Sequence, residues 1–218
     1  MIITDKFVWL HFPKCAGTLT ESLLRKIIPS HLNAEFDEIV AKEYPSVRWH
    51  NTVDERQNKI GRILADRDVI SNFRRLPNWM LSIVHFNVVR RGPKTPKELY
   101  VNGFYFHETG HKMFAEAMVE RYCGSNFWLR TECLADDICQ VFSRYFSVNE
   151  GAVRQYCSQK INASYWSGNI RDFFNEDDLR TLYNACPKWS ALEMRLYGNL
   201  LVGGAGFEPA TLGSNLER

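Results

Sequence analysis

The sequence predicts an α/β fold with a central, mostly parallel sheet. Segments with the apolar character of buried strands alternate along the chain with segments of helical spacing. With 218 residues, 45% hydrophobic and 24% charged, the chain suits one globular domain with a full core. We expect residues 1–200 to form that domain. Glycines and a proline interrupt any period in residues 201–218, so we expect a tail that is disordered or foreign to the natural domain.

The first half of the chain is expected to hold three strands, each followed by a helix. The strands are residues 6–12, 46–50 and 68–73, and the helices are residues 17–28, 54–65 and 77–90. The first helix ends before Pro29, and Pro77 suits the first turn of the third helix.

The second half begins with a loop at residues 93–104, which contain two prolines and a glycine. A helix at 108–122 and a strand at 126–130 follow, and Thr131 is a suitable N-cap for the next helix. Near the end, Asn175 caps a helix with Asp178 at its third position, and a last helix runs through residues 189–197.

Composition limits the partners and the compartment. A net charge of +2 is too small to indicate nucleic-acid binding, although basic residues bunch at 74–75 and 90–97. No apolar stretch approaches 18 residues, and no signal peptide is evident. Six cysteines without a C-x-x-C pair are typical of free thiols in a reducing compartment. We therefore expect a cytoplasmic protein without a membrane span. The oligomeric state is left open.

Residues 7–22 are the most informative stretch. Four apolar residues, Phe7 to Leu10, lead into His11-Phe12-Pro13-Lys14, and Cys15-Ala16-Gly17-Thr18 opens the helix. Free backbone N–H groups and the dipole of a helix N-terminus attract anions. Gly17 permits close approach, Lys14 supplies a positive charge, and Thr18 and Thr20 supply hydroxyls. The pattern predicts a phosphate- or sulfate-binding loop.

Two better-known phosphate motifs do not fit this stretch. The Walker A pattern requires lysine directly after its second glycine, but Lys14 precedes Gly17. A cysteine phosphatase built on Cys15 would require arginine where Glu21 stands.

A second basic site is expected after the strand at 68–73. Arg74 and Arg75 follow its carboxyl end, where ligands bind in open α/β sheets. Ser82 lies eight residues beyond Arg74 on the next helix. A guanidinium and a hydroxyl suit a phosphate group.

Residues 11–18 closely resemble the H-x-P-K-x-A-G-T loop of sulfotransferases, in their carbohydrate-type branch. The resemblance implies a P-loop-NTPase-like, three-layer fold and the donor 3′-phosphoadenosine-5′-phosphosulfate, which becomes adenosine 3′,5′-bisphosphate. It implies that residues 14–19 (Lys14, Cys15, Ala16, Gly17, Thr18 and Leu19) bind the 5′-phosphosulfate. Arg74 and Ser82 have the family's spacing for the 3′-phosphate.

The chain departs from the family pattern around Arg74. Arg75-Leu76 replaces the usual Asp/Asn-Pro, so Arg75 is an alternative phosphate ligand, and Trp79 stands where a second basic residue is common. Residues 127–137 and 175–197 resemble scaffold elements of the same branch. Golgi relatives usually carry a membrane anchor, so the resemblance points to a bacterial protein.

The family reaction moves a sulfuryl group to a hydroxyl, here of an unidentified acceptor, with carbohydrate among the candidates. Lys14 would neutralise the leaving group, and no metal is required. The base is His50 in the first place, at the end of the strand 46–50, with His85 and Glu55 as alternatives. His11 is expected to order the loop. The acceptor pocket is expected within residues 30–58 and 93–112.

Two other classes of function remain open. His107-Glu108-Thr109-Gly110-His111 fits the H-E-x-x-H zinc peptidase motif, although the metzincin extension fails at Phe114 and Ala117. The chain is alternatively a non-catalytic nucleotide-binding relative.

Overall fold

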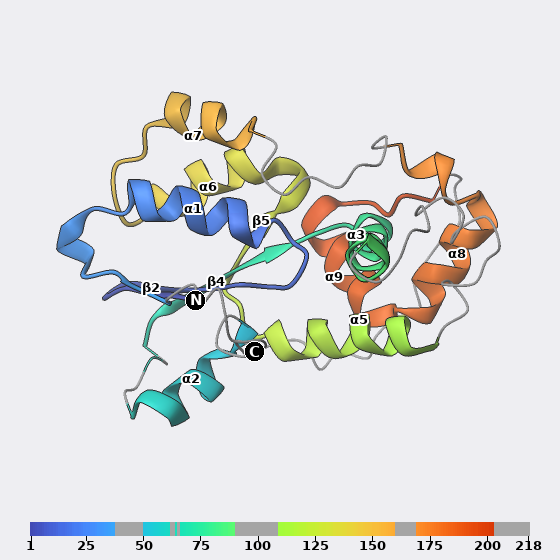
Figure 1. The fold of residues 1–218 in the computed structure, drawn as a ribbon, viewed down its shortest axis with the longest axis horizontal. Helices are drawn as coiled ribbons and strands as arrows, with labels where there is room; N and C mark the ends of the chain where they lie inside the picture. Colours follow the sequence, from blue (N-terminus) through green and yellow to red (C-terminus); the bar gives the residue numbers. More distant parts are fainter. Residues whose placement is uncertain (38–49, 62–63, 65, 90–108, 160–168, 203–218) are drawn as a thin grey trace. The chain divides into compact units, whose positions relative to one another are not determined.

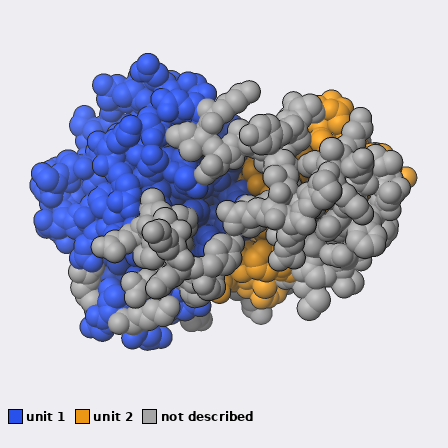
Figure 2. All heavy atoms as spheres, viewed as in Figure 1, with its two compact units in different colours: residues 1–73, 122–163 blue, residues 74–121, 164–218 orange. Residues whose placement is uncertain are grey.

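The computed structural model describes residues 1–37, 50–61, 64, 66–89, 109–159 and 169–202. The chain divides into two compact units, which Figure 2 distinguishes by colour. Unit 1 comprises Met1–Phe73 and Tyr122–Ala163, and unit 2 comprises Arg74–Arg121 and Ser164–Arg218.

Unit 1 contains a five-stranded mixed sheet with the strand order β3-β1-β2-β4-β5. The strands are β1 (Ile2–Ile3), β2 (Phe7–Leu10), β3 (Glu35–Phe36), β4 (Asp68–Phe73) and β5 (Phe127–Arg130). β2, β4 and β5 pair in parallel, whereas β1 pairs antiparallel with β2 and with β3. The predicted α/β class with a parallel central sheet is therefore confirmed.

The register brings the carboxyl ends of the parallel strands to one edge of the sheet. Leu10 of β2 lies opposite Ser71 of β4, and Phe73 lies opposite Arg130, the last residue of β5. The loop that begins at His11 leaves the sheet at this edge. Ligands of open α/β sheets bind at such an edge.

Four helices of the described part of unit 1 accompany the sheet. They are α1 (Gly17–Ile27), α2 (Val53–Ile60), α6 (Leu134–Phe142) and α7 (Glu150–Cys157). Figure 1 shows α1, α6 and α7 on one face of the sheet. The core lies between that face and these helices, where Phe7, Trp9 and Ile70 pack with Leu24 and Phe142.

The described part of unit 2 is helical. It contains α3 (Leu76–Val89), α5 (Thr109–Tyr122, whose last residue belongs to unit 1), α8 (Glu176–Ala185) and α9 (Pro187–Tyr197). α3 contacts α8 and α9, and the Trp79 ring lies 4.7 Å from that of Trp189, centroid to centroid. Short 3₁₀ turns lie at Ser30–Leu32 and Thr131–Cys133 in unit 1 and at Ile170–Asp172 in unit 2. Among the helices of the described residues, none combines the length and the apolar character that crossing a membrane requires.

Several element predictions hold, and others need correction. Thr131 does not cap α6: its hydroxyl donates to the Phe73 carbonyl oxygen at 2.9 Å, and Cys133 precedes the helix. α2 ends at Ile60 because Gly61 takes the left-handed conformation, with φ 63°. His50 lies in a 3₁₀ turn and not at the end of a strand, while residues 46–49 lie outside the described part.

The remaining sequence predictions fall partly outside the structure. The loop at 93–104 and most of the tail, 203–218, lie outside the described residues. The described chain ends with Leu200 buried and with the Leu201 N–H donating to the Tyr183 hydroxyl at 3.2 Å.

Candidate functional site

The turn between β2 and α1 has an unusual backbone. Lys14 and Ala16 both have positive φ, 65° and 61°, a conformation that costs non-glycine residues energy. Ala16 is the N-cap of α1 in this left-handed conformation. The predicted anion loop therefore carries strain at two of its residues, and such strain is concentrated at functional sites.

Gly17 is required by the close approach of His11. A Cβ atom added at Gly17 would lie 2.8 Å from His11 Cγ and closer still to Cδ2 and Nε2 of the same ring. No side chain fits between this backbone and the imidazole. The glycine that the motif predicts therefore serves the packing of His11 against the start of α1.

The N-terminus of α1 differs electrostatically from those of α2 and α8. Ala16 provides no side-chain cap, and the first turn of α1 holds no acidic residue. α2 and α8 instead begin with capping boxes, built on Thr52 and Asn175, and have acidic first turns. The positive end of the α1 dipole is thus not offset by a carboxylate in its own first turn.

The side chains of the loop divide into exposed and buried ones. Thr18 is exposed, and Lys14, Ala16 and Leu19 are half-buried. Cys15 is fully buried, and its N–H donates to the Phe12 carbonyl oxygen at 3.4 Å. The structure therefore gives Cys15 a part in the shape of the turn.

Thr20 belongs to a buried network and not to the loop surface. Its hydroxyl accepts from Asn72 Nδ2 at 2.9 Å and donates to the Ala16 carbonyl oxygen at 3.2 Å. Asn72 Oδ1 accepts from Trp9 Nε1, also at 2.9 Å. This network joins β2, β4 and α1, so Thr20 holds the loop's helix on the sheet.

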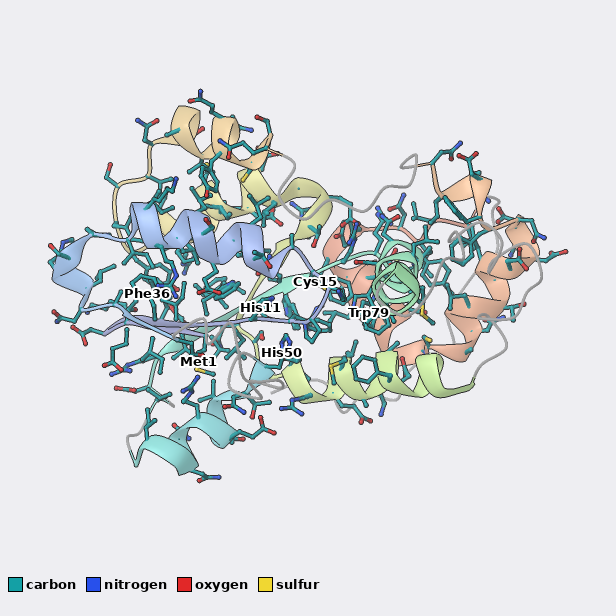
Figure 3. The ribbon with its side chains drawn as sticks, in the orientation of Figure 1. Met1, His11, Cys15, Phe36, His50 and Trp79 are labelled. Atoms are coloured by element: carbon teal, nitrogen blue, oxygen red, sulfur yellow. The ribbon has the colours of Figure 1, made fainter. Side chains whose placement is uncertain are left out.

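His11 lies at the centre of the site in unit 1. Its ring centroid is 5.1 Å from that of His50, and Figure 3 labels both residues, from the end of β2 and the segment before α2. Burial above all, with the charges of His50, the N-terminus and Lys14, lowers the pKa of His11 from 6.5 to about 3. His11 is therefore neutral at physiological pH and a weak base, in agreement with the loop-ordering role that the sequence predicts.

His50 makes hydrogen bonds through its ring and through its carbonyl oxygen. Its Nδ1 lies 3.0 Å from the carbonyl oxygen of His11. The hydroxyl of Tyr122 donates toward the same oxygen at 3.3 Å and toward the His50 carbonyl oxygen at 3.1 Å. The structure thus brings His50 beside the loop residue His11.

The alternative bases are placed differently. Glu55 Oε2 accepts from the Thr52 N–H at 2.9 Å and from Asn51 Nδ2 at 3.3 Å, so this carboxylate completes the capping box of α2. His85 belongs to α3 in unit 2, and its side chain lies outside the described part of the chain.

The second predicted phosphate site lies in unit 2. Arg74 follows β4 directly, and Ser82, half-buried, is on α3. The Arg74 carbonyl oxygen accepts from Trp189 Nε1 at 3.1 Å. The Lys14 loop belongs to unit 1, whereas Arg74 and Ser82 belong to unit 2.

Arg75 is bound within the packing of unit 2. Its Nη1 pairs with Glu193 Oε1 at 3.1 Å, and its guanidinium also donates to Asn199 and stacks over the Tyr197 ring at 4.1 Å. Glu193 is fully buried and also accepts from the Leu76 N–H at 2.7 Å. These contacts hold the Arg75 guanidinium against the packed helices of unit 2.

An ion pair holds the end of β5 to α6. The buried Asp137 of α6 accepts from the Arg130 N–H at 2.6 Å and pairs with the Arg130 guanidinium at 2.6 Å.

The predicted zinc motif is only partly described: His107, Glu108 and the side chain of His111 lie outside the described residues. Elsewhere in the described chain, no group of three metal-ligating side chains comes together.

No protein-family model, no curated protein and no solved structure matches this chain.

The sequence did not indicate Tyr122 and Asn72, whose hydrogen bonds join residues that are distant in the chain. A buried tyrosine and a polar residue within a strand carry no local motif that would have indicated them.

Proposed function

We propose that this chain is a sulfotransferase that moves a sulfuryl group from 3′-phosphoadenosine-5′-phosphosulfate to a hydroxyl of an acceptor, on a P-loop-like three-layer fold. The observation that carries the proposal is the turn from His11 to Thr18. It combines two left-handed residues, a glycine closed by an imidazole, a lysine, and a helix start without an acidic side chain. A strained backbone at a positive helix end suits a doubly charged anion.

Different groups of the loop bind different parts of the 5′-phosphosulfate. The N–H groups at the start of α1 and the exposed hydroxyl of Thr18 donate to the phosphate oxygens. Lys14 neutralises the bridging oxygen as its bond to sulfur breaks. Arg74 and Ser82, which have the family's spacing of eight residues, receive the 3′-phosphate.

The reaction is an in-line displacement at sulfur. The acceptor oxygen forms a new bond to sulfur while the bond from sulfur to the bridging phosphate oxygen breaks, and adenosine 3′,5′-bisphosphate leaves with that electron pair. His50 accepts the acceptor's proton. By analogy with phosphoryl transfer, positioning and electrostatic stabilisation supply most of the rate.

The test is to incubate the protein with the sulfate donor and a panel of saccharide and phenol acceptors. The rate of transfer is measured as the release of adenosine 3′,5′-bisphosphate. Lys14→Ala should lose roughly a hundredfold or more in rate with its fold intact. Lys6→Ala removes an exposed lysine that precedes β2, and it should leave the rate unchanged. A Lys14→Ala rate within a few-fold of wild type would refute the role of the loop. Donor binding without transfer to any acceptor would favour a non-catalytic nucleotide-binding protein.

A further inference from the structure

The hydroxyl of Tyr122 connects His11 and His50, which both belong to unit 1. Tyr122 is 1% exposed, and its ring packs on Phe12 with centroids 4.7 Å apart. Its hydroxyl donates toward the carbonyl oxygens of His11 and His50, at 3.3 Å and 3.1 Å. One buried side chain therefore ties the end of β2 to the segment that carries His50.

The same carbonyl of His11 fixes the tautomer of His50. A carbonyl oxygen only accepts hydrogen bonds, so His50 Nδ1, at 3.0 Å, must carry the hydrogen. In the neutral ring the lone pair then resides on Nε2. The bond from Nδ1 persists when Nε2 takes up a proton, so the ring need not move during proton transfer.

His11 also links this arrangement to the anion loop. Its ring fills the space where a side chain at residue 17 would lie, and its main chain accepts from His50. The segment that positions the imidazole of His50 is thus the segment that shapes the start of α1. A displacement of the His11 backbone would disturb both.

We propose that Tyr122 is a positioning residue: by holding the carbonyl groups of His11 and His50, it keeps His50 in the Nδ1–H tautomer with Nε2 as the proton acceptor. The catalytic consequence rests on the proposed function, in which His50 is the base. The tautomer of His50 does not depend on the proposed function, so an experiment can contradict either one without contradicting the other.

The direct test is nuclear magnetic resonance of the full chain labelled with ¹⁵N-histidine. The six histidines give six pairs of ring nitrogens, and the spectrum of His50→Gln identifies the pair of His50. Wild-type protein should show Nδ1 protonated and Nε2 unprotonated at high pH. Tyr122→Phe keeps the ring that packs on Phe12, and it should shift His50 toward the Nε2–H form that imidazole favours in water. A wild-type spectrum with Nε2 protonated would overturn the inference, even if the variant does not fold.

The control removes a hydroxyl elsewhere in the same unit. Tyr145 donates to Asp68 at 2.6 Å, at the first residue of β4 and so at the opposite edge of the sheet. Tyr145→Phe should leave the His50 tautomer unchanged. An identical tautomer in wild type, Tyr122→Phe and Tyr145→Phe would refute the role of Tyr122.

Kinetics supply the second readout. Tyr122→Phe should lower kcat about fivefold to tenfold, the value of one hydrogen bond, with KM for the donor unchanged. A raised KM with unchanged kcat would contradict positioning of the base. If wild type transfers no sulfuryl group while the tautomer responds as expected, the proposed function fails and the positioning role stands.

Discussion

At the scale of single residues, the site depends on the contact between Gly17 and His11. Their approach leaves no room for a Cβ atom, and the histidine is neutral because it is buried. The bond from His50 Nδ1 then reaches the main chain of the same histidine. One residue thus shapes the loop through its ring and orients a second imidazole through its carbonyl group.

Gly17→Ala should therefore be destabilising although alanine favours helices. Alanine gains up to about 1 kcal/mol in a helix, whereas forcing a methyl group into the His11 ring costs roughly 1–3 kcal/mol or more. We expect a lower Tm and weakened binding of the bisphosphate. Gly151→Ala in α7 is the matched control, because its Cβ would meet only Asn149 Oδ1 at 3.5 Å. Equal Tm changes in the two variants would contradict the account.

The burial of His11 predicts acid sensitivity. The pKa of His11 is about 3 in the folded chain and near 6.5 when unfolded, so the unfolded state binds more protons between these values. The stability that the neutral ring provides is complete above pH 6.5 and is lost progressively as the pH falls toward 3. Urea unfolding at a series of pH values should show this slope, and His11→Asn should reduce it. A slope unchanged in His11→Asn would show that other groups cause it.

At the scale of elements, the strand–loop–helix unit is held by a hydrogen-bonded chain from Trp9 through Asn72 to Thr20. This network fixes the first turn of α1 on β4 without using the exposed face of the loop. Thr20 is therefore part of the core, whereas Thr18, only two residues away, is exposed.

Thr20→Val should cost roughly 1–3 kcal/mol of unfolding free energy, because the buried amide of Asn72 loses its acceptor. Anion binding by the folded variant should persist. Thr18→Val, at an exposed position, should change stability by less than about 0.5 kcal/mol and weaken anion binding. Denaturation and calorimetry of the two variants check this, and the reverse pattern would contradict the division of roles.

The junction of β4 and α3 holds two arginines with different surroundings. Arg75→Ala should cost about 3 kcal/mol, because Glu193 would keep its burial and lose its positive partner. Burial raises the pKa of Glu193 to about 7, offset in part by its hydrogen bonds and Arg75. Since the protonated acid does not need Arg75, the loss should be larger at pH 8 than at pH 6. Thermal unfolding at both pH values tests this, and an equal loss would contradict it.

At the scale of the whole molecule, the features predicted correctly from the sequence are those that depend on residues close together in the chain. Strand β4 and the capping box at Asn175 were found where expected, because apolar runs and cap residues act within a few positions. The two-residue strands β1 and β3 are too short to show a period. Tyr122 was not predicted, because its hydrogen bond to the His11 carbonyl oxygen joins residues that are 111 positions apart in the sequence.

The proposed function depends most on the loop motif, and the limits of that motif are also physical. The sequence indicated Lys14, Gly17 and a helix start, but it offered the hydroxyls of both Thr18 and Thr20, and it left Arg75 open as an alternative to Arg74. Only the tertiary contacts show that the Thr20 hydroxyl accepts from Asn72 in the core and that Arg75 pairs with the buried Glu193.

The most direct test of the central claim is calorimetry of the full chain with adenosine 3′,5′-bisphosphate and with adenosine 5′-monophosphate. The account predicts tight binding of the bisphosphate and much weaker binding of the monophosphate. Arg74→Ala should remove most of that difference, whereas folded Lys14→Ala should weaken both ligands. Absence of bisphosphate binding, or equal affinity for the two nucleotides in wild type, would contradict the proposal that this chain is a sulfotransferase.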